Sequence, residues 1–139
     1  MNPIKRDLVQ RKIEIILSRL DLLRKLDLQK INASSDLMLQ EALCHAMQNA
    51  IAAAIDIGQH ICAEKLASAP ETYTEAILQL AQVGVLDQEF ADDFSRVAKL
   101  RNVLVHLYEH VDIGFIASLV PKFIADFTHF VERVRLSAL

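Results

Sequence analysis

The chain has 139 residues, of which 53% are hydrophobic and 24% charged, and this composition indicates a globular chain rather than a disordered one. Three Gly and three Pro argue against a sandwich or barrel with many tight turns and favour a few long helices. The net charge of −3 gives no global basic field for nucleic acid, and no segment resembles a signal peptide or a membrane span, so we expect one cytoplasmic domain over residues 1–139.

The first predicted helix runs from about Ile4 to Leu28, where apolar residues recur every three or four positions. Residues 1–31 hold eight basic and four acidic side chains, a net charge of +4, which leaves −7 for the rest of the chain. This basic helix is either an electrostatic handle or an ordinary solvated face. A polar break is expected at Ile31–Ser35, because Asn and Ser favour turns and caps.

The second predicted helix, from about Asp36 to Leu66, is apolar nearly all round, which places it at the centre of the fold or against a partner. Cys44 and Cys62 both fall in this helix. Their separation along its axis would be about 27 Å, too far for a disulfide within the chain. We therefore expect free thiols.

Three further helices complete the prediction. The third spans about Tyr73–Val83 and is capped by Gly84, and the fourth follows Asp87 and ends near Leu104–Leu107. The fifth begins near Asp112, and one of its sides is apolar, formed by Phe115, Leu119, Phe123, Phe127, Phe130 and Val134. Pro121 should kink this helix or split off its first turn. The result is an all-α, up-and-down bundle of about five helices.

Polar side chains of the second helix fall within one arc of 120°, which we call the polar stripe: His45, Gln48, Asn49, Asp56, Gln59 and His60. An ordinary exposed face would carry Lys and Glu, whereas amides and imidazoles are costly to bury unless they are paired. The polar stripe is therefore a seam inside an oligomer, a support for a catalytic site, or a metal site built on Asp56 and His60.

A second cluster of polar side chains lies at the end of the fourth helix. Arg101 offers the fixed donors that hold a phosphate, and His106 is a side chain that can move a proton near neutral pH. The two would lie about 140° apart on a straight helix. Either the helix ends before His106, or a second subunit completes the site. A structural alternative has Arg101 pairing an acid and His106 capping the helix.

Residues 101–108, Arg-Asn-Val-Leu-Val-His-Leu-Tyr, have the form R-x4-H-x-Y. With the D-x-G-x-H-I segment at residues 56–61, they resemble the HepT-like branch of the HEPN superfamily, the ribonuclease toxins of MNT–HEPN toxin–antitoxin systems. Residues 70–73, 82–86 and 111–112 also match the layout of that family, so the resemblance extends from about residue 8 to 135. Leu107, often polar in relatives, and Pro121 depart from the family pattern.

The resemblance implies a bundle that dimerises through the R-x4-H region and cleaves RNA, either tRNA or mRNA, with no metal or other cofactor. Carried over by position, Arg101 and His106 are catalytic. A cognate MNT-type nucleotidyltransferase antitoxin would modify Tyr108 with AMP. The supporting residues would be Asp56, Asn102 and His60, with Asp56 orienting Arg101 or a histidine.

Two other functions remain open from the sequence. In the second hypothesis, the chain is a non-catalytic helical dimer that binds a nucleotide or a partner protein, and Arg101 holds a phosphate. A third hypothesis is a purely structural dimerisation partner of a nucleotidyltransferase, which the apolar second helix would suit. Homodimers or higher oligomers fit all three hypotheses.

Overall fold

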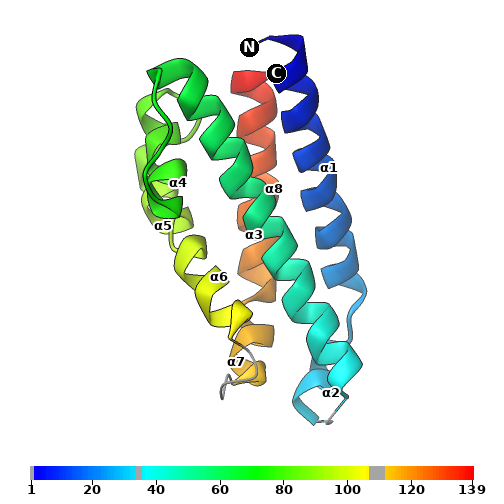
Figure 1. The fold of residues 1–139 in the computed structure, drawn as a ribbon. Coiled ribbons are helices and arrows are strands. Elements are labelled where there is room, and N and C mark those ends of the chain that lie inside the picture. The colour runs from blue at the N-terminus through cyan, green and yellow to red at the C-terminus, as the bar shows by residue number, and fades with distance from the viewer. Residues whose placement is uncertain (1, 34–35, 107–111) are drawn as a thin grey trace.

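The computed structural model describes residues 2–33, 36–106 and 112–139, and all regular elements within these ranges are helices (Figure 1). The all-α prediction is therefore confirmed. The helices are α1 (Pro3–Lys25), α2 (Leu28–Ala33), α3 (Leu37–Leu66), α4 (Tyr73–Gln82), α5 (Gln88–Phe94), α6 (Val97–Val105), α7 (Ile113–Ser118) and α8 (Val120–Ala138).

Helix α3 crosses the middle of the molecule, with α1 packed along one side and α4 and α6 along the other (Figure 1). Helix α8 packs beside α1, and α7 packs on α2 at the lower end of the bundle. Both chain ends lie at the opposite end of the bundle from α7 (Figure 1). The connected core of buried side chains draws on every helix, as expected for a bundle whose helices each bury one apolar face.

The ends of the long helices follow the capping residues in the sequence. Asn2 accepts a hydrogen bond from the Lys5 amide at 2.9 Å at the start of α1, and Asp36 does the same for the Leu39 amide of α3 at 3.2 Å. Gly84, with φ of +82°, follows α4 in the left-handed conformation that Gly adopts without strain. The predicted bounds of α3 and α4 are therefore close to those observed, whereas α1 ends at Lys25 and not at Leu28 as predicted.

The polar break expected at Ile31–Ser35 is wrong for residues 31–33, which belong to α2. The Asp27 carboxylate accepts hydrogen bonds from the amides of Gln29 and Lys30, so it caps this short helix. The side chain of Ile31 is 1% exposed and joins the core. Burial of this side chain outweighs the turn propensity of its polar neighbours.

The fourth predicted helix is two helices, α5 and α6, separated at Ser95 and Arg96. Phe94, the last residue of α5, stacks on Phe90 and Phe130 and meets Phe127 edge-on, with ring centroids 4.9–5.1 Å apart. This aromatic packing holds the end of α5 against α8. The change of direction after Ser95 then lets α6 run along α3.

The fifth predicted helix is also divided, into α7 and α8, at Leu119. This split of the first turns is one of the two outcomes predicted from Pro121. Phe115 shares the side of Leu119, Phe123 and Phe127, as predicted, but its side chain is 58% exposed, because it lines an open groove beside α6 and not the packed core. The side chains of Phe123, Phe127, Phe130 and Val134 are buried as predicted.

The thiols of Cys44 and Cys62 are free and buried in α3, as predicted. Burial raises the pKa of each thiol to about 11, because a thiolate loses its hydration there. Within the described residues, no helix is long and apolar enough to cross a membrane.

Candidate functional site

Arg101 lies in the middle of α6, and His106 directly follows the last residue of that helix. Helix α6 stops at Val105, and His106 occupies the C-cap position with φ −100° and ψ 33°. The His106 amide donates to the Val103 carbonyl at 3.2 Å, which tightens the last turn. Helix α6 therefore ends before His106, as one of the two sequence-based alternatives required, and the backbone departs from helical dihedrals at His106 itself. Arg101 is half-buried and His106 is exposed.

A hydrogen bond from the polar stripe fixes the end of α6. The side-chain amide of Gln48 on α3 donates to the backbone carbonyl of Leu104 at 3.1 Å. The last carbonyls of a helix have no partner inside it, so this amide satisfies a group that would otherwise lack one. The side chain of Leu104 is fully buried beneath the same turn. The motif is therefore held to the central helix by both polar and apolar contacts.

The guanidinium of Arg101 lies over the ring of Tyr73, with 5.3 Å between its central carbon and the ring centroid. This distance is within the range of a cation–π contact. Among residues 2–33, 36–106 and 112–139, Arg101 forms no ion pair with a carboxylate. The structural alternative, in which Arg101 pairs with an acid, is therefore not seen over this part of the chain, where Arg101 contacts an aromatic ring instead.

Tyr73 is the first residue of α4, and local hydrogen bonds fix its position. The hydroxyl of Thr72 accepts from the Glu75 amide at 3.0 Å, and the Glu75 carboxylate accepts from the Glu71 amide at 3.0 Å. These bonds form a close variant of the capping box. Sequence reasoning identified this residue as a helix start and missed its contact with Arg101, because nothing in the spacing of residues 73 and 101 signals that their helices meet.

The polar stripe lies on the surface of the chain, with His45 and Asn49 exposed and its other four members half-buried. Its members face different neighbours: Gln48 reaches α6, whereas Asp56 forms an ion pair of 2.9 Å with Lys12 of α1. Within the described residues, Asp56 is therefore paired with α1 and not, as expected, with Arg101 or a histidine. The opposite charges of α1 and Asp56 were visible in the sequence, but the register between the two helices was not.

The remaining predicted site residues are less constrained by their surroundings. Asn102 is exposed on α6, and His60 is half-buried on α3. Tyr108 and Leu107 lie outside the described residues. Within the residues that are described, no three His, Cys, Asp or Glu side chains are grouped as a metal site would require.

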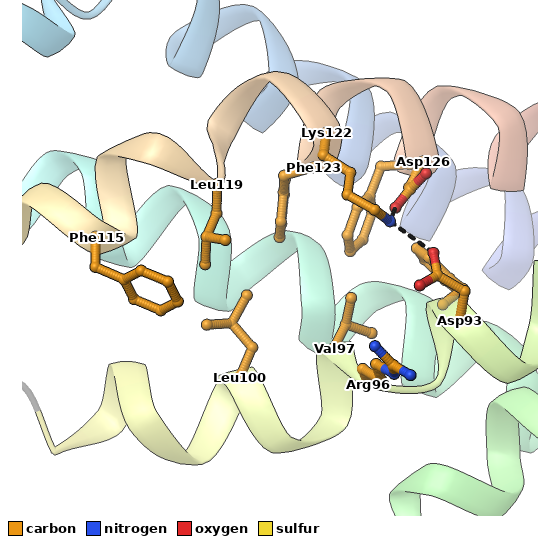
Figure 2. A pocket seen from close by; sticks show the side chains of 11 residues that line it. Asp93, Arg96, Val97, Leu100, Phe115, Leu119, Lys122, Phe123 and Asp126 are labelled. Atoms are coloured by element: carbon orange, nitrogen blue, oxygen red, sulfur yellow. Dashed lines mark hydrogen bonds and ion pairs between the residues drawn. The ribbon is translucent and has the colours of Figure 1, made fainter.

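An apolar groove of about 390 Å³ opens on another side of α6, between α5 and α6 on one wall and α7 and α8 on the other (Figure 2). The side chains of Phe115 and Leu119 face Leu100 across it (Figure 2). At one end of the groove, Lys122 contacts the carboxylates of Asp93 and Asp126, each at 2.6 Å. The sequence did not indicate this groove, because its walls depend on both helix breaks.

The sequence of the chain is similar to a known protein family and to several characterised proteins. The profile of a family described as "HepT-like: Ribonuclease HepT-like" matches residues 10–134. The chain is 26% identical over 100 residues to a protein of Shewanella oneidensis named "mRNA nuclease HepT", a match that covers 72% of this chain and 75% of the relative. It is 24% identical over 135 residues to "tRNA nuclease HepT" of Aphanizomenon flos-aquae, covering 96% of this chain and 92% of the relative.

A solved structure has the same fold. It is described as the tri-AMPylated Shewanella oneidensis HEPN toxin in complex with MNT antitoxin, and it superimposes with a TM-score of 0.83 at 24% identity. The match covers 98% of this chain and 99% of the other. At this identity the likeness concerns the fold alone.

Proposed function

Because the chain belongs to the HepT-like ribonuclease family, we propose that it is the ribonuclease toxin of a toxin–antitoxin pair and cleaves RNA with Arg101 and His106, without a metal ion. The observation that carries the proposal is the end of α6 between these two residues, with Gln48 anchoring the last turn. Two relatives, each matched over most of its own length, are named as nucleases of mRNA and of tRNA, which supports RNA as the substrate.

The reaction needs three chemical contributions. The ribose 2′-hydroxyl must lose a proton, the charge that develops on the phosphate must be stabilised, and the leaving 5′-oxygen must gain a proton. His106 of one subunit removes the first proton, and His106 of a second subunit supplies the last. The product is a 2′,3′-cyclic phosphate. An exposed imidazole at a helix end is accessible to a large RNA substrate, which suits this role.

Arg101 contributes the stabilisation of charge. Its planar guanidinium binds two phosphate oxygens at once through parallel N–H donors. The absence of a carboxylate partner within the described residues leaves these donors available for the substrate. This availability supports Arg101 as the phosphate clamp, with Asn102 exposed next to it on α6.

We propose that two chains form the active unit and that the polar stripe contributes to the interface between them. Gln48 has a partner on α6, whereas the other amides and imidazoles of the stripe lie at the surface, where a second chain would supply hydrogen-bond partners. His60 belongs to this stripe and supports the site from there. Asp56 supports it indirectly, because its ion pair holds α1 on α3.

A nucleotidyltransferase antitoxin would silence this activity by transferring AMP to Tyr108. This residue follows His106 by two positions in the sequence. Added AMP carries bulk and negative charge, and both would exclude an RNA phosphate from the site. The HEPN toxin of Shewanella oneidensis is described as tri-AMPylated and in complex with an MNT antitoxin, which supports this regulation.

The deciding experiment incubates purified protein with total cellular RNA in the presence of EDTA. We expect the wild type to cleave RNA and His106→Ala to be at least about 100-fold slower, as for the loss of a general acid or base. His129→Gln is the control, since this change removes a histidine on α8 that packs against Phe90. Equal cleavage by wild type and His106→Ala would refute the proposal.

Lack of cleavage by the wild type requires a second measurement, the intact mass of the protein. A mass increased by whole AMP units would show a silenced toxin, which removal of the modification should reactivate. An unmodified and inactive protein that binds mononucleotides would instead be a non-catalytic binding module.

A further inference from the structure

We propose that Tyr73 is a positioning residue for Arg101: its ring holds the guanidinium in place by a cation–π contact and leaves the N–H donors for an RNA phosphate. This inference rests on the proposed function of Arg101 as the phosphate clamp. It assigns a role to the start of α4, which lies outside the R-x4-H motif.

The chemistry of the contact distinguishes it from an ion pair. A carboxylate would bind the N–H donors of Arg101 and compete directly with a phosphate for them. An aromatic ring instead attracts the positive charge through its π face, and the donors at the edge of the guanidinium stay unoccupied. The separation of 5.3 Å between Arg101 and the Tyr73 ring satisfies this geometry. A ring that is 46% exposed also leaves this contact accessible to substrate.

The helical turn that carries Tyr73 packs on α3. Gly58 lies so close to α4 that a β-carbon at this position would be 2.4 Å from the Ala76 carbonyl oxygen. The Cys62 thiol donates to the same carbonyl at 3.9 Å. The first turn of α4 is therefore packed directly on the backbone of α3, and the hydrogen bonds of Thr72 and Glu75 fix the turn itself.

Arg101 is held by the same central helix. The hydrogen bond from Gln48 to the Leu104 carbonyl fixes the end of α6 on α3. Helices α4 and α6 are thus both attached to α3, α4 through the contact of Ala76 with Gly58 and α6 through the bond from Gln48. Because both helices pack on α3, the distance between the Tyr73 ring and the Arg101 guanidinium is set by the fold. The contact with the ring then restricts the Arg101 side chain to fewer rotamers before RNA binds.

The test is a double-mutant cycle measured as kcat and KM for RNA cleavage. We expect Tyr73→Leu to lower kcat/KM by about 2- to 30-fold, the range that corresponds to a cation–π contact. Tyr73→Phe keeps the ring and should remain within about twofold of the wild type. In an Arg101→Ala background, Tyr73→Leu should cause no further loss, because the ring acts through Arg101.

The cycle separates this role from two others. Further loss in the Arg101→Ala background would mean that Tyr73 touches the RNA itself, for example by stacking on a base, and would overturn the proposal. A purely structural role would lower the thermal stability of Tyr73→Leu and would reduce cleavage equally with or without Arg101.

A direct measurement is independent of activity. The Tyr73 ring should shift the NMR resonances of the Arg101 side chain, and this shift should persist in Tyr73→Phe and vanish in Tyr73→Leu. Absence of the shift in the wild type would overturn the contact. If the wild type cleaves RNA and Tyr73→Leu cleaves it equally well, only the role of Tyr73 fails. If the unmodified wild type cleaves no RNA, the proposed function fails first and this inference with it.

Discussion

Gly58 of α3 packs against the backbone of Ala76 in α4, and a β-carbon at position 58 would lie 2.4 Å from the Ala76 carbonyl oxygen and 3.0 Å from its carbon. Glycine inside a helix costs about 0.5–1 kcal/mol relative to alanine. Here it allows two helix backbones to approach more closely than any other residue would. The two helices carry Tyr73 and the polar stripe, so this contact helps to shape the candidate site.

We expect Gly58→Ala to destabilise the protein by about 1–3 kcal/mol, because the obstructing atom belongs to the backbone and one helix must move away. Cleavage should also fall, since the displaced α4 carries Tyr73. Urea denaturation and the RNA assay measure the two effects. Gly84→Ala is the matched control: φ is +82° and no atom obstructs the β-carbon, so strain costs about 1–2 kcal/mol and cleavage by the folded protein is retained. Full stability of Gly58→Ala would contradict the close packing.

Gln48→Leu should leave the Leu104 carbonyl without its hydrogen bond and cost about 1 kcal/mol. The last turn of α6 should then open more often, which hydrogen exchange of its amides would detect. Cleavage should fall as well, because Arg101 lies in the same short helix. Gln10→Leu is the control, since this half-buried residue of α1 lies outside the polar stripe and its side chain makes no hydrogen bond within the described residues. Unchanged exchange in Gln48→Leu would show that apolar packing alone holds the turn.

The ion pair between Lys12 and Asp56 can be tested with one variant of each residue, and we expect the two variants to have similar effects. Their side chains are 26% and 39% exposed, so solvent weakens the pair, and Lys12→Met and Asp56→Asn should each cost no more than about 1 kcal/mol. Thermal unfolding at low and high salt measures this cost. If Asp56 serves only to hold α1, both variants should cleave RNA equally well. A large loss of cleavage confined to Asp56→Asn would instead show that this carboxylate supports the catalytic site directly, as the sequence analysis expected.

The buried thiols should react slowly with alkylating reagents, and the free energy of unfolding should decrease at high pH. With pKa values raised to about 11, Cys44 and Cys62 stay protonated at pH 8 and should react with iodoacetamide only after unfolding. The thiols lose their protons more readily in the unfolded chain, because the pKa of each thiol is lower there. Their contribution to stability is therefore complete below about pH 9 and is lost as the pH rises towards 11. Rapid labelling of the native protein would show that α3 opens locally.

The sequence predicted the parts of the fold that depend on local signals. The start of α3 and the end of α4 follow from Asp36 and Gly84, whose side-chain chemistry or backbone freedom acts within one turn. The division at Leu119 follows from Pro121 in the same way. The break after Phe94 was missed because it depends on aromatic packing against α8, which no local pattern records.

The candidate site shows the same limit. The spacing of Arg101 and His106 indicated that a helix had to end or a second subunit had to take part, and α6 does end there. The partners of the site residues were not predicted. Tyr73 beside Arg101 and Lys12 beside Asp56 depend on how three helices are offset along one another, and that offset is set by the packing of many side chains.

The bond from Gln48 reaches a backbone atom of α6, so it does not depend on which side chain stands at position 104. Val103 and Val105 are exposed around the same turn. The surface next to Arg101 can therefore change its composition without loosening the helix beneath it. Such a turn can diversify towards new nucleic acid sequences while its scaffold stays constant, which makes residues 103 and 105 the natural positions for a selection library.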